Sequence, residues 1–147
     1  MRTAGLRHVA IFGGTSPPGL AWARLYAGPT CRVSLVGRSE GPGPAPADVD
    51  ADATRTYACD LTALADLPPF LARLCRERGE VTDLVFFQRF RGDGDDWEGE
   101  HRVSVRATQV LVEGLAARPA AGPRAIVIVT SPASTHVAAE QSASYHA

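Results

Sequence analysis

The sequence predicts an α/β fold with a doubly wound parallel sheet, because short apolar runs alternate with segments of helical spacing. Five runs are expected as strands, at residues 8–12, 31–36, 55–59, 81–87 and 125–129. These runs are largely apolar, which is typical of parallel strands buried on both faces. Right-handed crossovers then give the strand order 3-2-1-4-5.

The segments between the expected strands indicate three helices and two long loops. Residues 19–26 follow Pro18, which is tolerated in a first helical turn. Residues 61–78 have leucines at helical spacing, and Pro68-Pro69 should bend or restart that helix. Residues 100–118 form the longest helical candidate, whereas residues 40–52 and 89–99 have the composition of loops. We see no second domain in residues 1–147.

Composition excludes several classes of partner. The chain is 45% hydrophobic and 21% charged with a net charge of −1, so it offers no basic field for nucleic acid or an anionic membrane. No apolar run approaches the roughly 18 residues that span a bilayer, and no signal peptide is evident. We therefore expect a cytoplasmic protein.

No metal site or disulfide framework is predicted. The three cysteines are widely spaced and form no CxxC pair, so they are interpreted as small buried hydrophobes. The acidic residues between positions 93 and 100 lack the ordered spacing of a calcium loop and are interpreted as a solvated surface.

A phosphate-binding turn is predicted where the first strand ends. Its residues are Gly13, Gly14, Thr15, Ser16, Pro17, Pro18 and Gly19. Glycines at such a turn allow the backbone to approach a pyrophosphate, whose charge is stabilised by the amino terminus of the following helix. A glycine-rich turn alone is a weak signal, but here a strand precedes it and a helix follows.

The ends of the second and third strands carry two further candidates. Arg38 and Ser39 follow the second strand, where an acid would bind a ribose 2′-hydroxyl and an arginine accommodates a 2′-phosphate. Arg38 therefore favours NADP over NAD, unless it is only a solvated loop residue. Asp60 follows the third strand and either meets an adenine edge or caps the next helix.

In this order, these motifs resemble the short-chain dehydrogenase/reductase family, which has a Rossmann fold. The resemblance covers nearly the whole chain: the glycine turn, Val-Gly-Arg-Ser at 36–39, Cys-Asp-Leu-Thr at 59–62, Thr130-Ser131, and the run into Tyr145. It implies an oxidoreductase that uses NADP to act on a small-molecule carbonyl or alcohol, and a full-length form that can be a homo-oligomer. It also implies that Asp60 and Leu61 bind the cofactor.

The resemblance implies three catalytic residues. Ser131 matches the serine that hydrogen-bonds the substrate carbonyl, Tyr145 matches the proton donor, and Ser104 stands where the family has an asparagine in the long helix. Other positions depart from the family. Pro17 falls on the middle glycine of the turn, and residues 87–92 replace the usual Asn-Asn-Ala-Gly. Within that segment, Arg89 and Arg91 either touch substrate anions or belong to a solvated loop.

The lack of lysine bears on the expected chemistry. All 15 basic residues are arginine. The family's lysine, four positions after the tyrosine, would fall beyond Ala147. That ammonium lowers the tyrosine pKa from about 10 toward neutrality. We therefore expect a fragment that is inactive alone. Alternatives are a non-catalytic NADP sensor or a member of the nucleotide-sugar branch, whose turn Gly13, Ser16 and Gly19 approximate.

Overall fold

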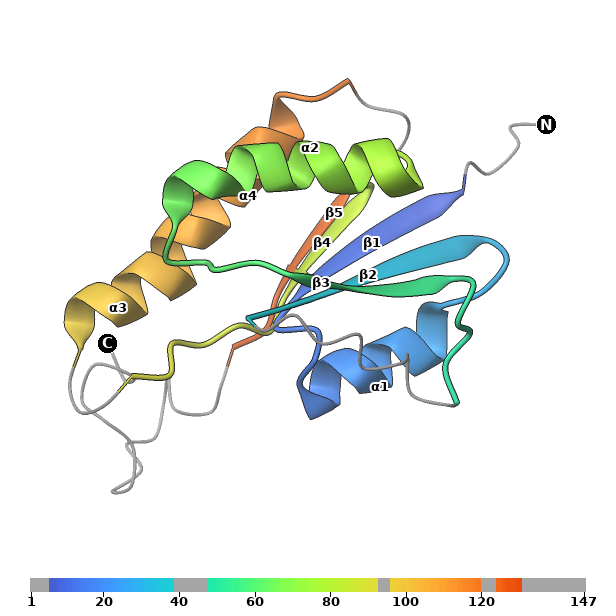
Figure 1. Cartoon of the computed structure of the whole chain (residues 1–147), viewed down its shortest axis with the longest axis horizontal. Coiled ribbons are helices and arrows are strands. Elements are labelled where there is room, and N and C mark those ends of the chain that lie inside the picture. Colours follow the sequence, from blue (N-terminus) through green and yellow to red (C-terminus); the bar gives the residue numbers. More distant parts are fainter. Residues whose placement is uncertain (1–5, 39–47, 93–95, 120–123, 131–147) are drawn as a thin grey trace.

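A parallel sheet of five strands lies at the centre of the protein, with helices on both of its faces (Figure 1). The computed structural model describes residues 6–38, 48–92, 96–119 and 124–130. The strand order is β3-β2-β1-β4-β5, which confirms the predicted fold. The chain therefore adds strands outward from β1 first on one side, through β2 and β3, and then on the other, through β4 and β5. Doubly wound folds bind ligands at the point between β1 and β4, where the strand order reverses.

Each strand lies within two residues of its predicted bounds. The strands are β1 (Arg7–Phe12), β2 (Cys31–Gly37), β3 (Thr54–Ala58), β4 (Asp83–Phe86) and β5 (Ala125–Ile128). All neighbouring pairs are parallel, and β1 aligns Val9 with Val33 of β2 and with Asp83 of β4. Because the sheet is parallel throughout, the carboxyl ends of its strands meet at one edge.

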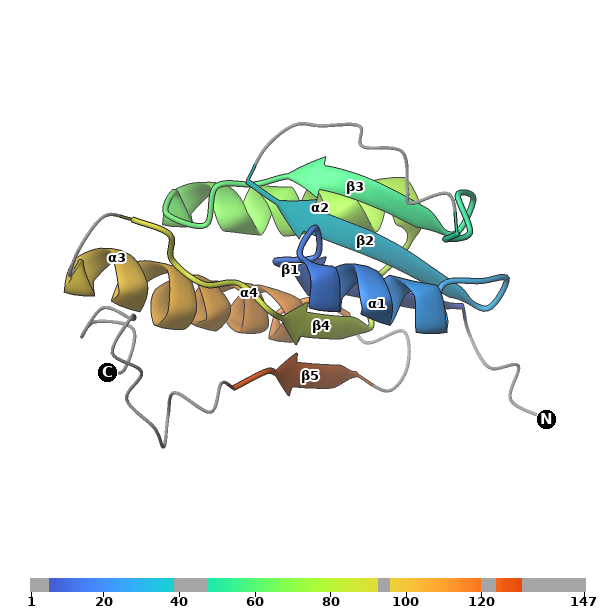
Figure 2. The ribbon, with the colours of Figure 1, turned by 90° about the horizontal axis from the view of Figure 1, so that it is seen from below.

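The apolar side chains on the two faces of the sheet form two separate cores, each covered by helices. Helix α1 (Pro17–Tyr26) covers one face, and α2 (Leu67–Arg78) and α4 (Ala107–Ala116) cover the other (Figure 2). Alternate residues of β1 serve the two sides: Val9 and Ile11 belong to the core beneath α1, and Ala10 and Phe12 to the core beneath α2 and α4. Burial on both faces explains why β1 has an uninterrupted apolar sequence.

The second predicted helix is shorter than expected. Residues 61–63 form a turn, Leu64–Asp66 form a short 3₁₀ helix (η1), and α2 begins only at Leu67. The proline pair explains this restart. Pro68 and Pro69 lack amide protons, so they fit the first turn of a new helix but not the interior of a longer one.

The first and third helices begin earlier than predicted. Helix α1 starts at Pro17 rather than at Gly19. The long helix starts with α3 (Trp97–His101), because the carboxylate of Asp96 accepts a hydrogen bond from the amide of Gly99 at 2.8 Å and caps it. It continues through a π-helical turn, η2 (Arg102–Arg106), into α4. None of the helices in the described ranges is long and apolar enough to cross a membrane.

Candidate functional site

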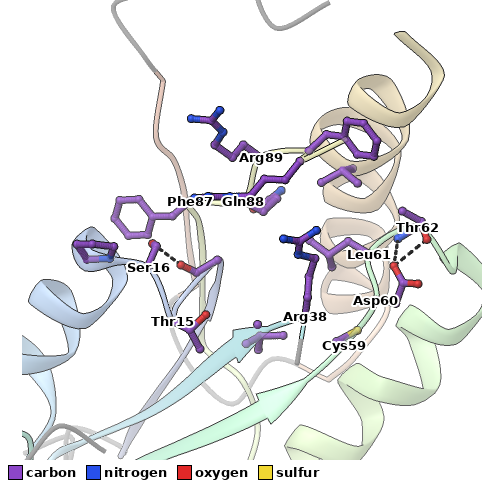
Figure 3. A pocket seen from close by; sticks show the side chains of 17 residues that line it. Thr15, Ser16, Arg38, Cys59, Asp60, Leu61, Thr62, Phe87, Gln88 and Arg89 are labelled. Carbon is purple, nitrogen blue, oxygen red and sulfur yellow. Dashed lines mark hydrogen bonds between the residues drawn. The ribbon is translucent and has the colours of Figure 1, made fainter. Parts of the chain in front are cut away.

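A cavity of about 630 Å³ opens at the carboxyl edge of the sheet, beside the ends of β1, β2, β3 and β4 (Figure 3). Its size lies in the range of small-molecule and cofactor sites. The lining residues come from the segments that follow β1, β2, β3 and β4, from the end of β2, from the start of α1 and from η2: Gly13, Thr15, Ser16, Pro17, Val36, Gly37, Arg38, Cys59, Asp60, Leu61, Thr62, Phe87, Gln88, Arg89, Phe90, Arg91 and Val103.

The turn after β1 is compact and is held to the sheet. The amide of Gly14 donates to the carbonyl of Val36 at 3.0 Å, and both the amide and the hydroxyl of Ser16 donate to the carbonyl of Gly13. Gly13 has a φ of +73°, which favours glycine. A Cβ on Gly19 would lie 2.5 Å from the carbonyl oxygen of Gly14, so only glycine allows α1 to approach this closely. The turn therefore has the compactness that its glycines predict.

The start of α1 departs from an ordinary anion-binding helix terminus. Ser16 is the N-cap residue and makes no side-chain cap, and prolines occupy the first two helical positions. Proline has no N–H. Of the amides in the first turn, that of Leu20 already donates to the carbonyl of Ser16 at 2.9 Å. Few donors are therefore left at this terminus for a bound phosphate.

The wall formed by the ends of β2 and β3 carries opposite charges. Arg38 extends upward from the end of β2, and Asp60 and Leu61 lie to its right in Figure 3. One oxygen of Asp60, Oδ1, accepts from the hydroxyl of Thr62 at 2.7 Å and from its amide at 2.9 Å. These hydrogen bonds, helped by the charge of Arg38, lower the pKa of Asp60. Asp60 closes its own turn and does not cap α2, whose N-cap is Asp66.

The opposite wall is the loop after β4. Gln88 donates from Nε2 to the hydroxyl of Thr108 at 2.9 Å, and that hydroxyl donates to the carbonyl of Ser104 at 2.9 Å. The Oε1 atom of Gln88 is buried without a protein hydrogen-bond partner among the described residues. Trp22 packs edge-on against Phe87 at a centroid distance of 5.9 Å, which ties this loop to α1. The loop is therefore anchored at both Phe87 and Gln88.

The structure brings most of the predicted cofactor-binding residues together. Seven of them line the cavity: Gly13, Thr15, Ser16, Pro17, Arg38, Asp60 and Leu61. Pro18 and Gly19 lie in the first turn of α1 outside the lining. Ser104 lies in η2 with an exposed side chain and is not a lining residue, whereas its neighbour Val103 is. Ser39, Ser131 and Tyr145 lie outside the described residues.

Several lining residues were not predicted as parts of the site. Thr62, Phe87, Gln88 and Val103 are among them. Phe87 and Gln88 follow β4 directly and Thr62 lies in the turn after β3, so the convergence of strand ends was the signal that could have identified them. Val103 is apolar and helical, so no feature of the sequence indicates that it reaches a cavity. Within the described residues there is no group of three or more His, Cys, Asp or Glu side chains that could hold a metal ion.

Comparison with known proteins supports the fold through structure alone. Neither family models nor curated proteins give a match. A short-chain dehydrogenase/reductase from Serratia marcescens superposes with a TM-score of 0.79 at 18% identity, over 97% of this chain and 62% of that one. A 3-oxoacyl-[acyl-carrier protein] reductase from Brucella melitensis gives a TM-score of 0.72 at 22% identity, over 95% and 63%.

A third similar structure is a variant of actinorhodin polyketide ketoreductase, solved with NADPH. Its TM-score is 0.77 at 20% identity, over 99% of this chain and 60% of that one. This chain thus spans about three fifths of the length of these three enzymes. It has the Rossmann fold of short-chain dehydrogenases/reductases, so the predicted resemblance is confirmed at the level of fold.

Proposed function

We propose that residues 1–147 are the nucleotide-binding domain of a short-chain oxidoreductase, and that the cavity binds NADP(H). The observation that carries this proposal is the convergence of the glycine turn, Arg38 and Asp60 on one cavity at the carboxyl edge of the sheet. Dinucleotides bind doubly wound sheets at this place. The fit is good at the end of the cavity near Arg38, where a guanidinium can pair with a 2′-phosphate.

The predicted cofactor-binding residues have separate proposed tasks. Arg38, with Ser39, binds the 2′-phosphate and so selects NADP over NAD. Asp60 and Leu61 contact the adenine; both hydrogen bonds from Thr62 use Oδ1 of Asp60, so the proposal assigns Oδ2 to the ligand. Gly13, Thr15 and Ser16 face the phosphates, and NADPH, when bound, supplies the hydride for reduction of a carbonyl substrate.

The catalytic assignments rest on the family resemblance. Ser131 hydrogen-bonds the substrate carbonyl, Tyr145 donates the proton to its oxygen, and Ser104 assists proton transfer. Because the chain holds no lysine, no ammonium within it can lower the pKa of Tyr145. A positioned acid–base group contributes roughly 10²- to 10⁴-fold to rate. We therefore propose that the 147-residue chain alone reduces no ketone.

Calorimetric titration tests the binding assignment. NADP⁺ should bind the chain roughly tenfold or more tightly than NAD⁺, because a charge-assisted hydrogen bond contributes about 1.5–3 kcal/mol. Arg38→Gln should remove the preference, and Arg76→Gln, which changes an exposed arginine outside the cavity, should retain it. Equal affinities for the two nucleotides in the parent chain would refute the assignment.

A ketone panel with NADPH tests the catalytic part. The 147-residue chain should show no turnover above background. A longer chain with a lysine four positions after Tyr145 and further family-like strands should be active, and Tyr145→Phe should abolish that activity. Turnover by the 147-residue chain itself would contradict the proposal.

The second candidate function is a non-catalytic NADP sensor. The proline pair at the start of α1 favours it, because this terminus offers few donors for a tightly held phosphate. A longer chain that binds NADP⁺ but reduces no ketone would support the sensor over the enzyme.

A further inference from the structure

The glycine turn after β1 and the loop after β4 differ in how they can bind an anion. Where the fold ordinarily presents backbone amides to a pyrophosphate, this chain has Pro17 and Pro18. The remaining polar groups of the turn are largely engaged, since the amide of Gly14 donates to Val36 and the hydroxyl and amide of Ser16 donate to Gly13. The turn thus comes close to a phosphate without offering it the usual number of donors.

The loop after β4 carries arginines. Arg89 and Arg91 belong to the loop after β4, line the cavity and are exposed. In Figure 3 Arg89 lies above Phe87, on the same side of the cavity as Ser16, whereas Arg38 lies closer to Leu61 and Asp60. The two sides can therefore hold phosphates at separate positions.

The charge of the cavity is positive. Its lining contains three arginines, Arg38, Arg89 and Arg91, and among the described lining residues Asp60 is the single acid. Glu100 on α3 partly offsets Arg89: burial raises the pKa of Glu100, and the positive charge of Arg89 lowers it. Glu100 is not itself a lining residue, so the described lining holds three arginines and one carboxylate.

We propose that Arg89, assisted by Arg91, binds the pyrophosphate of the dinucleotide and so replaces the amides that the two prolines remove. This rests on the proposed function. A guanidinium pairs with phosphate oxygens through two parallel N–H donors, which suits it to this role better than a point charge. The loop is a stable platform, because Phe87 packs on Trp22 and Gln88 is hydrogen-bonded to Thr108. Recognition of the two phosphate groups is therefore divided between Arg38 and the Arg89 loop.

Two fragments of the dinucleotide separate these roles in calorimetric titrations of the full 147-residue chain. ADP-ribose carries the pyrophosphate without a 2′-phosphate, and adenosine 2′-monophosphate carries the reverse. Arg89→Gln should weaken ADP-ribose roughly tenfold and leave adenosine 2′-monophosphate unchanged, with a smaller loss for Arg91→Gln. Arg38→Gln should weaken adenosine 2′-monophosphate and leave ADP-ribose unchanged. Arg76→Gln is the matched control and should alter neither affinity.

A variant that is expected to increase the affinity for ADP-ribose distinguishes a specific effect from a loss of binding through misfolding. Pro17→Gly restores an amide donor at the start of α1 and should tighten ADP-ribose several-fold without affecting adenosine 2′-monophosphate. Thermal unfolding of each variant verifies that the fold is retained. If the parent binds ADP-ribose and Arg89→Gln binds it equally well, the inference is overturned and the proposed function stands. If the parent binds NADP⁺ and neither fragment, the division of roles is overturned. If the parent binds no nucleotide at all, the proposed function fails, and the inference fails with it.

Discussion

The two outer strands of the sheet, β3 and β5, occupy equivalent positions but differ in how they are covered. Tyr57 of β3 is 5% exposed, packs edge-on against Phe70 of α2 and donates its hydroxyl to Glu77 at 3.0 Å. In β5, Ile126 is 45% exposed and Ile128 is 61% exposed. An outer strand is therefore protected by what packs on it, and its apolar sequence alone does not show whether it is covered.

The two strands also differ in how side chains attach them to the rest of the protein. Strand β3 is attached on its face, where Arg73 of α2 stacks over the Tyr57 ring, and also just before its beginning, where Arg78 donates to the carbonyl of Ala53. Strand β5 is fastened at its beginning: Arg124, just before it, donates to the carbonyls of Leu115, Arg118 and Pro119 at the end of α4. Arg38 and Asp60, which line the cavity, follow β2 and β3 and so lie at the covered edge of the sheet.

The largest expected effect is a difference in stability between matched truncations of the two strands. Tyr57→Ala should lower the free energy of unfolding by about 3–5 kcal/mol, because it removes a buried ring and leaves a cavity. Ile128→Ala should cost less than about 1 kcal/mol, because most of that side chain is exposed already. Urea unfolding measures both. Tyr57→Phe is the control: it keeps the ring, loses only the hydrogen bond to Glu77 and should cost about 0.5–1.5 kcal/mol. Equal losses for Tyr57→Ala and Ile128→Ala would show that burial does not distinguish the two edges.

The fold could be predicted from the sequence, but which outer strand is covered by other elements could not. Glycines, prolines and apolar runs report local backbone geometry and burial, so the strand order and bounds followed from them. The run at residues 125–129 is as apolar as that of β1, yet all of its residues except the half-buried Val127 are exposed, because burial depends on elements far away in sequence. The burial of Val103 beside the cavity likewise depends on the π-helical turn η2, which the hydrophobic periodicity of the sequence does not predict.

For the site, the sequence predicted the residues whose role follows from a strand end. Arg38 follows the second predicted strand and Asp60 the third, and both line the cavity. The sequence allows either an adenine contact or a helix cap for Asp60; its two hydrogen bonds from Thr62 cannot be deduced without the turn geometry. Ser131 and Tyr145 stay predictions, since they lie outside the described residues.

The next expected effect concerns the thiol that follows β3. Burial, together with the charges of Asp60 and Asp66, raises the pKa of Cys59 to about 11. Near pH 8 its thiolate population should be roughly a hundredfold smaller than that of an unperturbed thiol, so alkylation should be slower by a similar factor. Peptide mapping after iodoacetamide treatment gives the rate for Cys59 itself.

Two comparisons test the cause. Denaturation in urea should restore the rate of a free thiol. Asp60→Asn should accelerate labelling only a few-fold, roughly, because burial is the larger cause of the raised pKa. A native rate equal to the denatured rate would show that the β3 side of the cavity is open to solvent.

The smallest expected effect is a pH dependence that originates between the two edges, in β1. His8 is 1% exposed; its Nδ1 donates to the carbonyl of Gly79 at 2.7 Å, and its Nε2 accepts from the hydroxyl of Ser34 at 2.8 Å. The hydrogen bond from Ser34 requires the neutral ring, because protonated Nε2 cannot accept, whereas Nδ1 can donate to Gly79 in either protonation state. Burial is the main reason why the pKa of His8 is lowered; Arg78 and Arg32 lower it further, while the Gly79 carbonyl and Glu80 oppose them.

The sign of the effect follows from this lowered pKa. Above about pH 6.5 the ring is neutral in both the folded and the unfolded chain, so His8 adds no pH dependence. Below that pH the unfolded chain binds a proton that the folded chain does not, and stability should fall by up to about 1.4 kcal/mol per pH unit. Urea unfolding at pH 7.5, 6.5, 5.5 and 5.0 measures the slope of the unfolding free energy against pH. This range lies above the pH at which the carboxylates of Asp60 and Glu80, whose pKa values are lowered, begin to contribute.

His8→Gln keeps a donor and an acceptor and should flatten the slope between pH 6.5 and 5.0. His101→Gln alters an exposed histidine of α3 and should leave that slope as it is in the parent chain. If His8→Gln retains the slope, the buried ring of β1 is not the group that the folded chain holds neutral.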